Sequence, residues 1–189
     1  MFTKYIENFI SDDECDLIIS LGESIDLNPM KSTRMVKGKI VTTDVLYKGN
    51  KRVGGYITNE LLETPVIKNL SNKIIKLSNE LNPFNGIVYK GVSKYSFNRY
   101  EIDDFLDWHS DGHEILNGAT LTYIIQLNDN YDDGYVKYRI NDVEHNVNKK
   151  KGSVFVFDSN TLHSVEKITN GTRYSINVWP SKTIKKSII

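Results

Sequence analysis

A histidine and an aspartate two residues apart, His109 and Asp111, are the residues of this chain best suited to chemistry. They lie in the stretch FLDWHSDGHE, residues 105–114, which holds two of the four histidines in the sequence. In an extended chain alternate side chains point the same way, so the imidazole and the carboxylate would share one face. Together they offer a metal ion two ligands of different softness. An ordinary polar turn is the alternative interpretation.

A helical form of the same stretch would pair His109 with His113, four residues further on. Gly112 would interrupt such a helix, and Asp111 would point away from both histidines. We therefore favour the extended His-x-Asp pair, which still needs a third ligand.

His163 is the best candidate for that third ligand. It follows the apolar run GSVFVFD, residues 152–158, and would stand at the mouth of a β structure. His145, in the alternating segment VEHNVN, is expected to face solvent and is left out. Two histidines and one carboxylate leave three open positions on an octahedral metal ion, which is the ligand set of non-haem Fe(II) oxygenases. With no thiolate cluster available, Fe(II), Mn(II) and Zn(II) are the ions that such a site favours.

Arg173 stands ten residues after His163, inside a run of β-branched and aromatic residues, TRYSINVW. A guanidinium is costly to bury there unless an anion pairs with it, and its planar fork suits a carboxylate. A dicarboxylate could chelate the metal through one end and a neighbouring keto oxygen, and pair with Arg173 through the other. That description fits 2-oxoglutarate. The alternative is an arginine that pairs with a nearby aspartate or lies at a strand edge.

Helices are predicted in the N-terminal half. Ser11 and Glu14 have the spacing of a capping box before apolar residues at helical spacing, and Gly22 is the predicted end of this first helix. A second helix is predicted over residues 64–82, with Thr64 as its N-cap and a proline at its first position.

Residues 24–55 are polar and rich in lysine, threonine and glycine. We predict a long loop with one or two short strands. It is either a lid that closes over a bound peptide or a plain surface loop.

The second half of the chain has the texture of a β structure. Short runs of β-branched and aromatic residues alternate with Gly, Asn and Asp clusters, which is typical of an antiparallel sandwich or barrel. Helices come first and strands later, so the predicted class is α+β, with helices packed on one face of a β core. We predict a single domain over residues 1–189, with a helical part at about 1–84 and a β core at about 85–180.

Composition narrows the function classes. Lys plus Arg and Asp plus Glu each number 24, so the net charge is zero, which disfavours a partner such as duplex nucleic acid. Cys15 is the only cysteine, so no internal disulfide forms and a reducing cytoplasm is the expected compartment. No apolar stretch approaches the length of a membrane span, and no membrane partner is expected.

At this point the chain resembles the 2-oxoglutarate/Fe(II)-dependent dioxygenases, in particular their prolyl 4-hydroxylase-like branch. Members of that branch carry a Tyr nine residues before His-x-Asp, a distal His, a basic residue about ten positions later and a Trp six positions after that. The matching positions in this sequence are Tyr100, His109, Asp111, His163, Arg173 and Trp179. The run RYSINVW is close to the corresponding strand of the animal oxygen-sensing prolyl hydroxylases, and LTYIIQLND looks like the strand that lines the cosubstrate pocket.

One family motif departs from the pattern. The Gly-Gly-x-Thr that follows the Leu-Asn strand is replaced by Asp-Asp-Gly-Tyr-Val at residues 132–136. Gly134 keeps one glycine, and Val136 takes the place of the threonine that would contact the cosubstrate.

The resemblance implies a double-stranded β-helix, or jelly roll, and a set of roles. His109, Asp111 and His163 would bind Fe(II), and Arg173 would pair with the distal carboxylate of 2-oxoglutarate. Tyr100 would donate its hydroxyl to the same carboxylate, unless it is a core tyrosine bonded to backbone. Trp179 would pack against the pocket or simply fill the core. O2 is the third reactant, and ascorbate is a further candidate cofactor.

The activity implied is hydroxylation of a C–H bond with release of succinate and CO2. The resemblance favours a prolyl residue in a peptide or protein, as in a procollagen-proline 4-dioxygenase-like enzyme. Two alternatives stay open: a hydroxylase of a free amino acid or other small molecule, and a non-catalytic jelly-roll binding module. The zero net charge disfavours a nucleic-acid demethylase.

Overall fold

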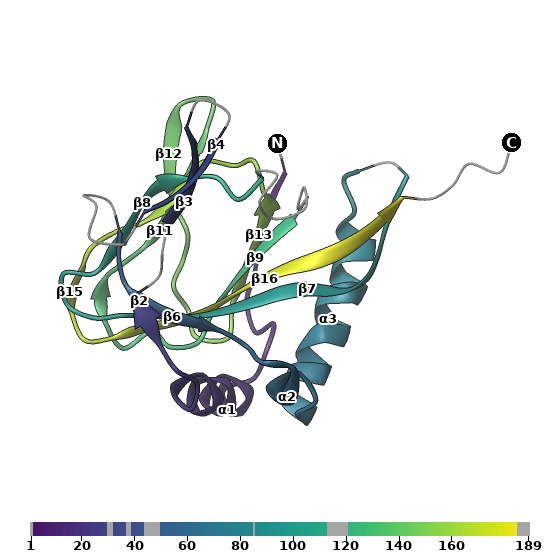
Figure 1. Cartoon of the computed structure of the whole chain (residues 1–189), viewed down its shortest axis with the longest axis horizontal. Coiled ribbons are helices and arrows are strands. Elements are labelled where there is room, and N and C mark those ends of the chain that lie inside the picture. The colour runs from purple at the N-terminus through teal and green to yellow at the C-terminus, as the bar shows by residue number, and fades with distance from the viewer. Residues whose placement is uncertain are drawn as a thin grey trace, which may run out of the picture.

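The computed structural model describes residues 2–29, 32–36, 39–43, 50–84, 86–112 and 121–184. Two antiparallel sheets form its frame, and the helices lie on one side of it (Figure 1). The larger sheet runs in the order β1 (Thr3–Ile6), β13 (Val154–Asp158), β9 (Leu121–Gln126), β16 (Arg173–Ile184), β7 (Ile87–Tyr100), β6 (Val53–Tyr56) and β2 (Asn28–Pro29).

The smaller sheet has five strands, in the order β12 (Val143–Asn146), β11 (Val136–Ile140), β14 (His163–Val165), β8 (Phe105–His109) and β5 (Asn50–Lys51). Two further antiparallel pairs are β10 (Asp132–Asp133) with β15 (Ile168–Asn170), and β3 (Ser32–Val36) with β4 (Lys39–Thr43). The predicted jelly-roll class is confirmed.

The helices are α1 (Asp12–Glu23), α2 (Asn59–Leu62) and α3 (Pro65–Leu81). Ser11 and Glu14 make both hydrogen bonds of the predicted capping box, and Thr64 is the N-cap of α3 without a side-chain cap bond. The predicted stop at Gly22 is wrong, because α1 continues to Glu23.

Gly22 serves packing instead: a Cβ there would lie 2.3 Å from the ring of Phe97 on β7, closer than real Cβ contacts come. None of the helices in the described ranges is long and apolar enough to cross a lipid bilayer.

Strand alternation divides the larger sheet into two chemically different faces. On β9, Leu121, Tyr123 and Ile125 belong to the same core cluster as Ile18 of α1 and Ile74 of α3. The intervening residues of β9 face the other way, toward the smaller sheet, where a second apolar cluster lies. Helices therefore cover one face of the larger sheet, and the other face is free to line an interior between the sheets (Figure 1).

Residues 24–55 contain more regular structure than predicted. Their described parts include β2, β3, β4, β5 and most of β6, and β6 extends the larger sheet by pairing with β7. β5 and β6 have no local signal, because each pairs with a strand far away in the chain, β8 and β7 respectively. The lid function stays a prediction, and its residues 30–31, 37–38 and 44–49 lie outside the described ranges.

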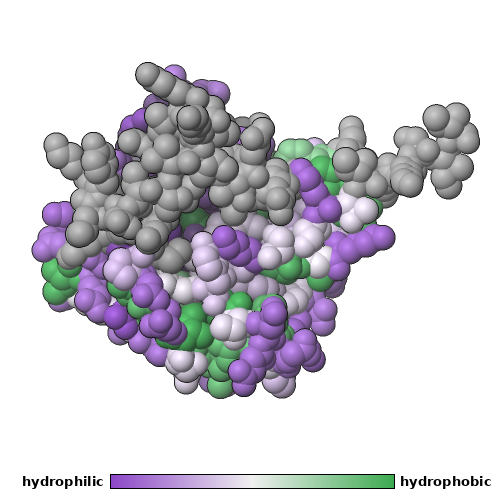
Figure 2. Space-filling view, in the orientation of Figure 1, coloured by the Kyte–Doolittle hydropathy of each residue, from purple (hydrophilic) through white to green (hydrophobic). Residues whose placement is uncertain are grey.

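The described surface is mixed in character. On the face shown in Figure 2, hydrophobic residues form small separate areas among hydrophilic ones. The large hydrophobic side chains that are exposed come from distant parts of the chain: Leu17, Tyr56, Ile102, Val143 and Leu162. Scattered single residues of this kind are ordinary on a globular surface.

Candidate active site

Two neighbouring strands of the smaller sheet bring the predicted metal ligands together. His109 ends β8 and His163 begins β14, and the two are register partners across the strand pair. Asp111 follows β8 by two residues, and its carboxylate lies 3.7 Å from Nε2 of each histidine. One ligand atom from each of the three residues lies within 4.8 Å of the others. No second such group of His, Cys, Asp or Glu occurs among the described residues.

Backbone carbonyls orient both imidazoles. Nδ1 of His109 lies 2.8 Å from the carbonyl oxygen of Asp107, and Nδ1 of His163 lies 3.0 Å from that of Thr161. In the tautomer that makes these bonds, Nδ1 carries the proton and the Nε2 lone pair is free to bind a metal. Both Nε2 atoms then face Asp111.

The imidazole of His109 is neutral at physiological pH. Burial, and the neighbouring ring of His163, lower the pKa of His109 far below its usual value, and together they outweigh the opposite effect of Asp111. A neutral imidazole is the form that binds a metal.

Asp111 is held by several donors. Its Oδ2 accepts hydrogen bonds from Oγ1 of Thr122 at 3.1 Å and from the indole Nε1 of Trp179 at 3.3 Å. The Thr122 hydroxyl also lies 3.0 Å from Oγ of Ser159, whose carbonyl accepts the backbone N–H of Asp111 at 2.8 Å. These bonds fix the carboxylate before any metal arrives. Two imidazole nitrogens and a fixed carboxylate fit the ligand set of Fe(II) oxygenases.

Arg173 is a buried cation with neutral partners. Its side chain is 1% exposed, Nη1 donates to Oγ of Ser175 and Nη2 to Oε1 of Gln126, each at 3.1 Å. Its Nε has no hydrogen-bond partner, and no carboxylate in the described ranges forms an ion pair with it. The buried hydroxyl of Tyr131 also has no such partner, and burial raises its pKa although the charge of Arg173 opposes the rise. A buried positive charge with only neutral partners fits an anionic ligand.

Tyr100 lies beside this arginine. The Arg173 guanidinium carbon is 5.0 Å from the centroid of the Tyr100 ring, and the two residues are register partners of β16 and β7. The Tyr100 hydroxyl accepts a hydrogen bond from Nη1 of Arg52 at 3.2 Å. Tyr100 therefore lies beside Arg173, and its role toward the distal carboxylate stays a prediction. Trp179 contacts the candidate ligand Asp111 through its indole N–H, a contact that was not predicted.

Four residues of the site were not predicted as site residues from the sequence: Arg52, Thr122, Gln126 and Tyr131. Thr122 and Gln126 have a signal in hindsight, since they are polar residues at alternate positions of an otherwise apolar strand. Arg52 and Tyr131 sit in loops and have no such signal. His145, which was left out, is exposed on β12 and stacks on Tyr138. His113 lies outside the described residues.

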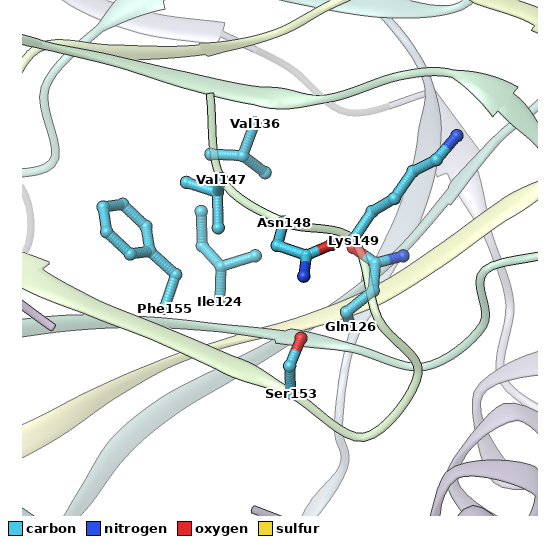
Figure 3. A pocket seen from close by; sticks show the side chains of 8 residues that line it. All are labelled: Ile124, Gln126, Val136, Val147, Asn148, Lys149, Ser153 and Phe155. Carbon is cyan, nitrogen blue, oxygen red and sulfur yellow. The ribbon is translucent and has the colours of Figure 1, made fainter. Parts of the chain in front are cut away.

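A small cavity lies between the sheets beside Gln126 (Figure 3). Its volume of about 10 Å³ has room for about one water molecule. Apolar side chains line one part and polar ones the other: Ile124, Val136, Val147 and Phe155, then Gln126, Asn148, Lys149 and Ser153. Val136, at the position of the family's threonine, thus points into the interior. The lining residues do not include the three metal ligands.

Comparison with known proteins agrees with this geometry. Residues 95–181 match the family described as the 2OG-Fe(II) oxygenase superfamily, a region that holds all three candidate ligands and Arg173. No curated protein matches the sequence of the chain.

Solved structures share the fold at low sequence identity. A prolyl 4-hydroxylase from Pseudomonas putida superposes with a TM-score of 0.73 at 17% identity, covering 98% of this chain and 93% of that one. A viral collagen prolyl hydroxylase from Paramecium bursaria chlorella virus-1, solved with 2-oxoglutarate, gives 0.69 at 18% identity and covers 97% of each chain. A prolyl hydroxylase from Trichoplax adhaerens, in complex with a hypoxia-inducible-factor peptide, gives 0.70 at 17% identity, covering 94% and 82%.

Identities this low show a common fold, and the match over residues 95–181 adds a likeness in sequence to the superfamily. The resemblance predicted from the sequence is therefore confirmed: residues 95–181 match the 2OG-Fe(II) oxygenase superfamily, and prolyl 4-hydroxylases are among the structural neighbours of the chain.

Proposed function

We propose that this protein is an Fe(II)- and 2-oxoglutarate-dependent dioxygenase that hydroxylates a C–H bond, with His109, Asp111 and His163 as the iron ligands. The observation that carries the proposal is the convergence of the three ligand atoms within 4.8 Å of one another. The buried guanidinium of Arg173, without a carboxylate partner among the described residues, supports the cosubstrate half. The proposal takes residues 1–189 as one oxygenase domain, with the cytoplasm as its compartment and ascorbate as a further cofactor.

When bound, iron and 2-oxoglutarate reduce O2, insert one oxygen atom into the substrate C–H bond, and release succinate and CO2. The chain's own residues prepare the site for them. The two backbone carbonyls hold the imidazoles with Nε2 free, and Thr122 and Trp179 hold Asp111. Arg173 offers its fork to the distal carboxylate. Tyr100 stands beside it as a second donor.

A prolyl residue in a peptide or protein is the proposed substrate. The support is the similarity in fold to three prolyl hydroxylases, one of them bound to a peptide. A protein or peptide partner follows from the same similarity, and a procollagen-proline 4-dioxygenase-like specificity is part of this proposal.

The iron site and cosubstrate pocket are tested by titrating the Fe(II)-loaded protein with 2-oxoglutarate in the absence of O2. We expect a visible charge-transfer band as the keto acid chelates the metal. The band should be absent in His163→Ala. It should require about 10- to 100-fold more 2-oxoglutarate in Arg173→Ala, because removing one partner of a buried charged hydrogen-bond pair costs about 1.5–3 kcal/mol.

His145→Ala is the matched control, because this histidine is exposed on β12 and outside the site. It should titrate like the wild type. No band in a folded, iron-loaded wild-type protein would contradict the oxygenase proposal and favour a jelly-roll binding module.

The substrate is tested by counting succinate released with proline-containing peptides, with the same peptides carrying alanine for proline, and with free amino acids. Succinate formation that depends on both the peptide and its proline is the expected result. Turnover with free amino acids alone would instead identify a small-molecule hydroxylase.

A further inference from the structure

Arg52 is a second arginine of the candidate site, and it lies outside residues 95–181 that match the superfamily. It is the single residue between β5 and β6. The residue before it pairs with Phe105 on β8 of the smaller sheet, and the residue after it pairs with Arg99 on β7 of the larger sheet. Arg52 is therefore placed where the chain passes from one sheet to the other, beside the end of β7 that carries Tyr100.

The guanidinium of Arg52 reaches Tyr100 at its hydroxyl. Nη1 donates to the phenolic oxygen at 3.2 Å, and the guanidinium carbon lies 5.8 Å from the ring centroid. Arg173 contacts the same ring at 5.0 Å. Nε of each arginine is buried without a hydrogen-bond partner, and no carboxylate of the described ranges pairs with either of them.

The positions of Arg52 and Arg173 beside Tyr100 determine which hydrogen bonds the Tyr100 hydroxyl can make. A phenolic group has one proton to donate and an oxygen that accepts. Since Arg52 donates to the oxygen of Tyr100, the proton of Tyr100 is left for another acceptor. Next to two guanidiniums that have no carboxylate partner in the described part of the chain, the most favoured acceptor is an anion. A donor that itself accepts a charged hydrogen bond is also a stronger donor.

We propose that Arg52 is a positioning residue for 2-oxoglutarate: by donating to the Tyr100 oxygen, it turns the Tyr100 hydroxyl into a donor for the distal carboxylate that Arg173 binds. The inference rests on the proposed function. It assigns a cosubstrate role to the segment before the β core.

The test is the 2-oxoglutarate affinity of the full chain loaded with Fe(II) without O2, read from the visible band, for Arg52→Gln, Tyr100→Phe and the double variant. Arg52→Gln removes the charged hydrogen bond to the Tyr100 oxygen, and this loss should weaken 2-oxoglutarate binding by about fivefold. Because Arg52 acts through the Tyr100 hydroxyl, the double variant should bind no more weakly than Tyr100→Phe alone. Arg52→Lys, which keeps a charged donor, should recover part of the loss.

Arg139→Gln is the matched control, since Arg139 also lies over an aromatic ring, that of Trp108, but away from Tyr100. Its affinity should equal that of the wild type. If glutamine at position 52 prevents folding, the double variant Arg52→Lys/Tyr100→Phe takes its place. Its 2-oxoglutarate affinity should equal that of Tyr100→Phe alone if Arg52 acts through the Tyr100 hydroxyl.

Each outcome separates this inference from the proposed function. Wild-type affinity in Arg52→Gln would overturn the role of Arg52 and leave the oxygenase proposal standing. Losses that multiply in the double variant would show that Arg52 acts independently of Tyr100, which also overturns the inference. A wild-type protein that binds Fe(II) but no 2-oxoglutarate would instead overturn the proposed function.

Discussion

Asp111 is the most constrained of the three candidate ligands. It accepts from Thr122 and Trp179 on two strands of the larger sheet, although it belongs to the segment after β8 of the smaller one. The carboxylate thus joins the two sheets across the interior. Partners of this kind orient metal ligands and raise metal affinity, because the ligand pays less entropy when the ion binds.

Trp179→Phe keeps the aromatic ring and removes the indole N–H that reaches Asp111. We expect Fe(II) affinity to fall by about tenfold, the lower end of the range for such partners. Competition with a chelator under anaerobic conditions measures it. Trp108→Phe is the control, because Trp108 lies over Arg139 instead. Unchanged iron affinity in Trp179→Phe would show that this bond does not support the ligand.

The sequence was sufficient to select the three candidate ligands that the structure brings together, but not the residues that support them. His-x-Asp and a distant His form a recognisable spacing, and Arg173 is conspicuous in an apolar run. Either Thr122 or Tyr123 could have faced the site, because strand alternation alone does not say which face is inward. The structure turns Thr122 to Asp111 and Tyr123 to Ser78 of α3, at 2.7 Å.

At the scale of elements, α3 is the main helical support of the larger sheet. It contacts both β7 and β16, and its own residues Ile67, Leu70 and Ile74 are buried. β7 and β16 carry Tyr100 and Arg173 on their opposite, interior face. Helix packing on one face therefore steadies the cosubstrate residues on the other.

Ile74→Ala removes buried methyl groups from this contact, since Ile74 is 0% exposed. The free energy of unfolding should fall by about 2–5 kcal/mol, measured by urea denaturation. Leu17→Ala on α1 is the control: Leu17 is 56% exposed, and its change should stay within about 0.5 kcal/mol. Equal losses at both positions would contradict the assigned packing.

Helices were the more predictable elements. The capping box at Ser11 and the apolar stripe of α3 are local signals, because each lies within one short segment of the sequence. Strand pairing is non-local, so the sequence near residues 53–56 does not predict that β6 pairs with β7. Gly22 was misjudged for the same reason, because the ring that requires a glycine there, Phe97, is remote in sequence.

At the scale of the whole molecule, folding buries several titratable side chains and raises their pKa values. Burial raises the pKa of the Cys15 thiol from 9.0 to about 12 and that of the Tyr95 hydroxyl from 10.0 to about 12. Burial also raises the pKa of Tyr123. All three belong to the core between helices and sheet. Their protonated forms are favoured by the folded state.

Stability should therefore be lost at alkaline pH. Because these pKa values are higher in the folded state, the protonated groups stabilise the fold fully below about pH 9, where they are also protonated in the unfolded chain. This stabilisation is lost as the pH rises toward 12. Melting temperatures measured from pH 8 to pH 12 should fall across this window. A melting temperature that stays constant through it would contradict the assigned burial of these groups.

Arg173 and Trp179 occupy the same strand, β16, six residues or roughly 20 Å apart, and an even spacing keeps both on the interior face. An inserted or deleted residue between them would turn one of the two outward. The proposed cosubstrate residue and the support of the candidate iron ligand thus depend on the register of one strand. We expect lineages of this chain to change the length of β16 only beyond Trp179, where the register with β7 already shifts between Trp179 and Pro180.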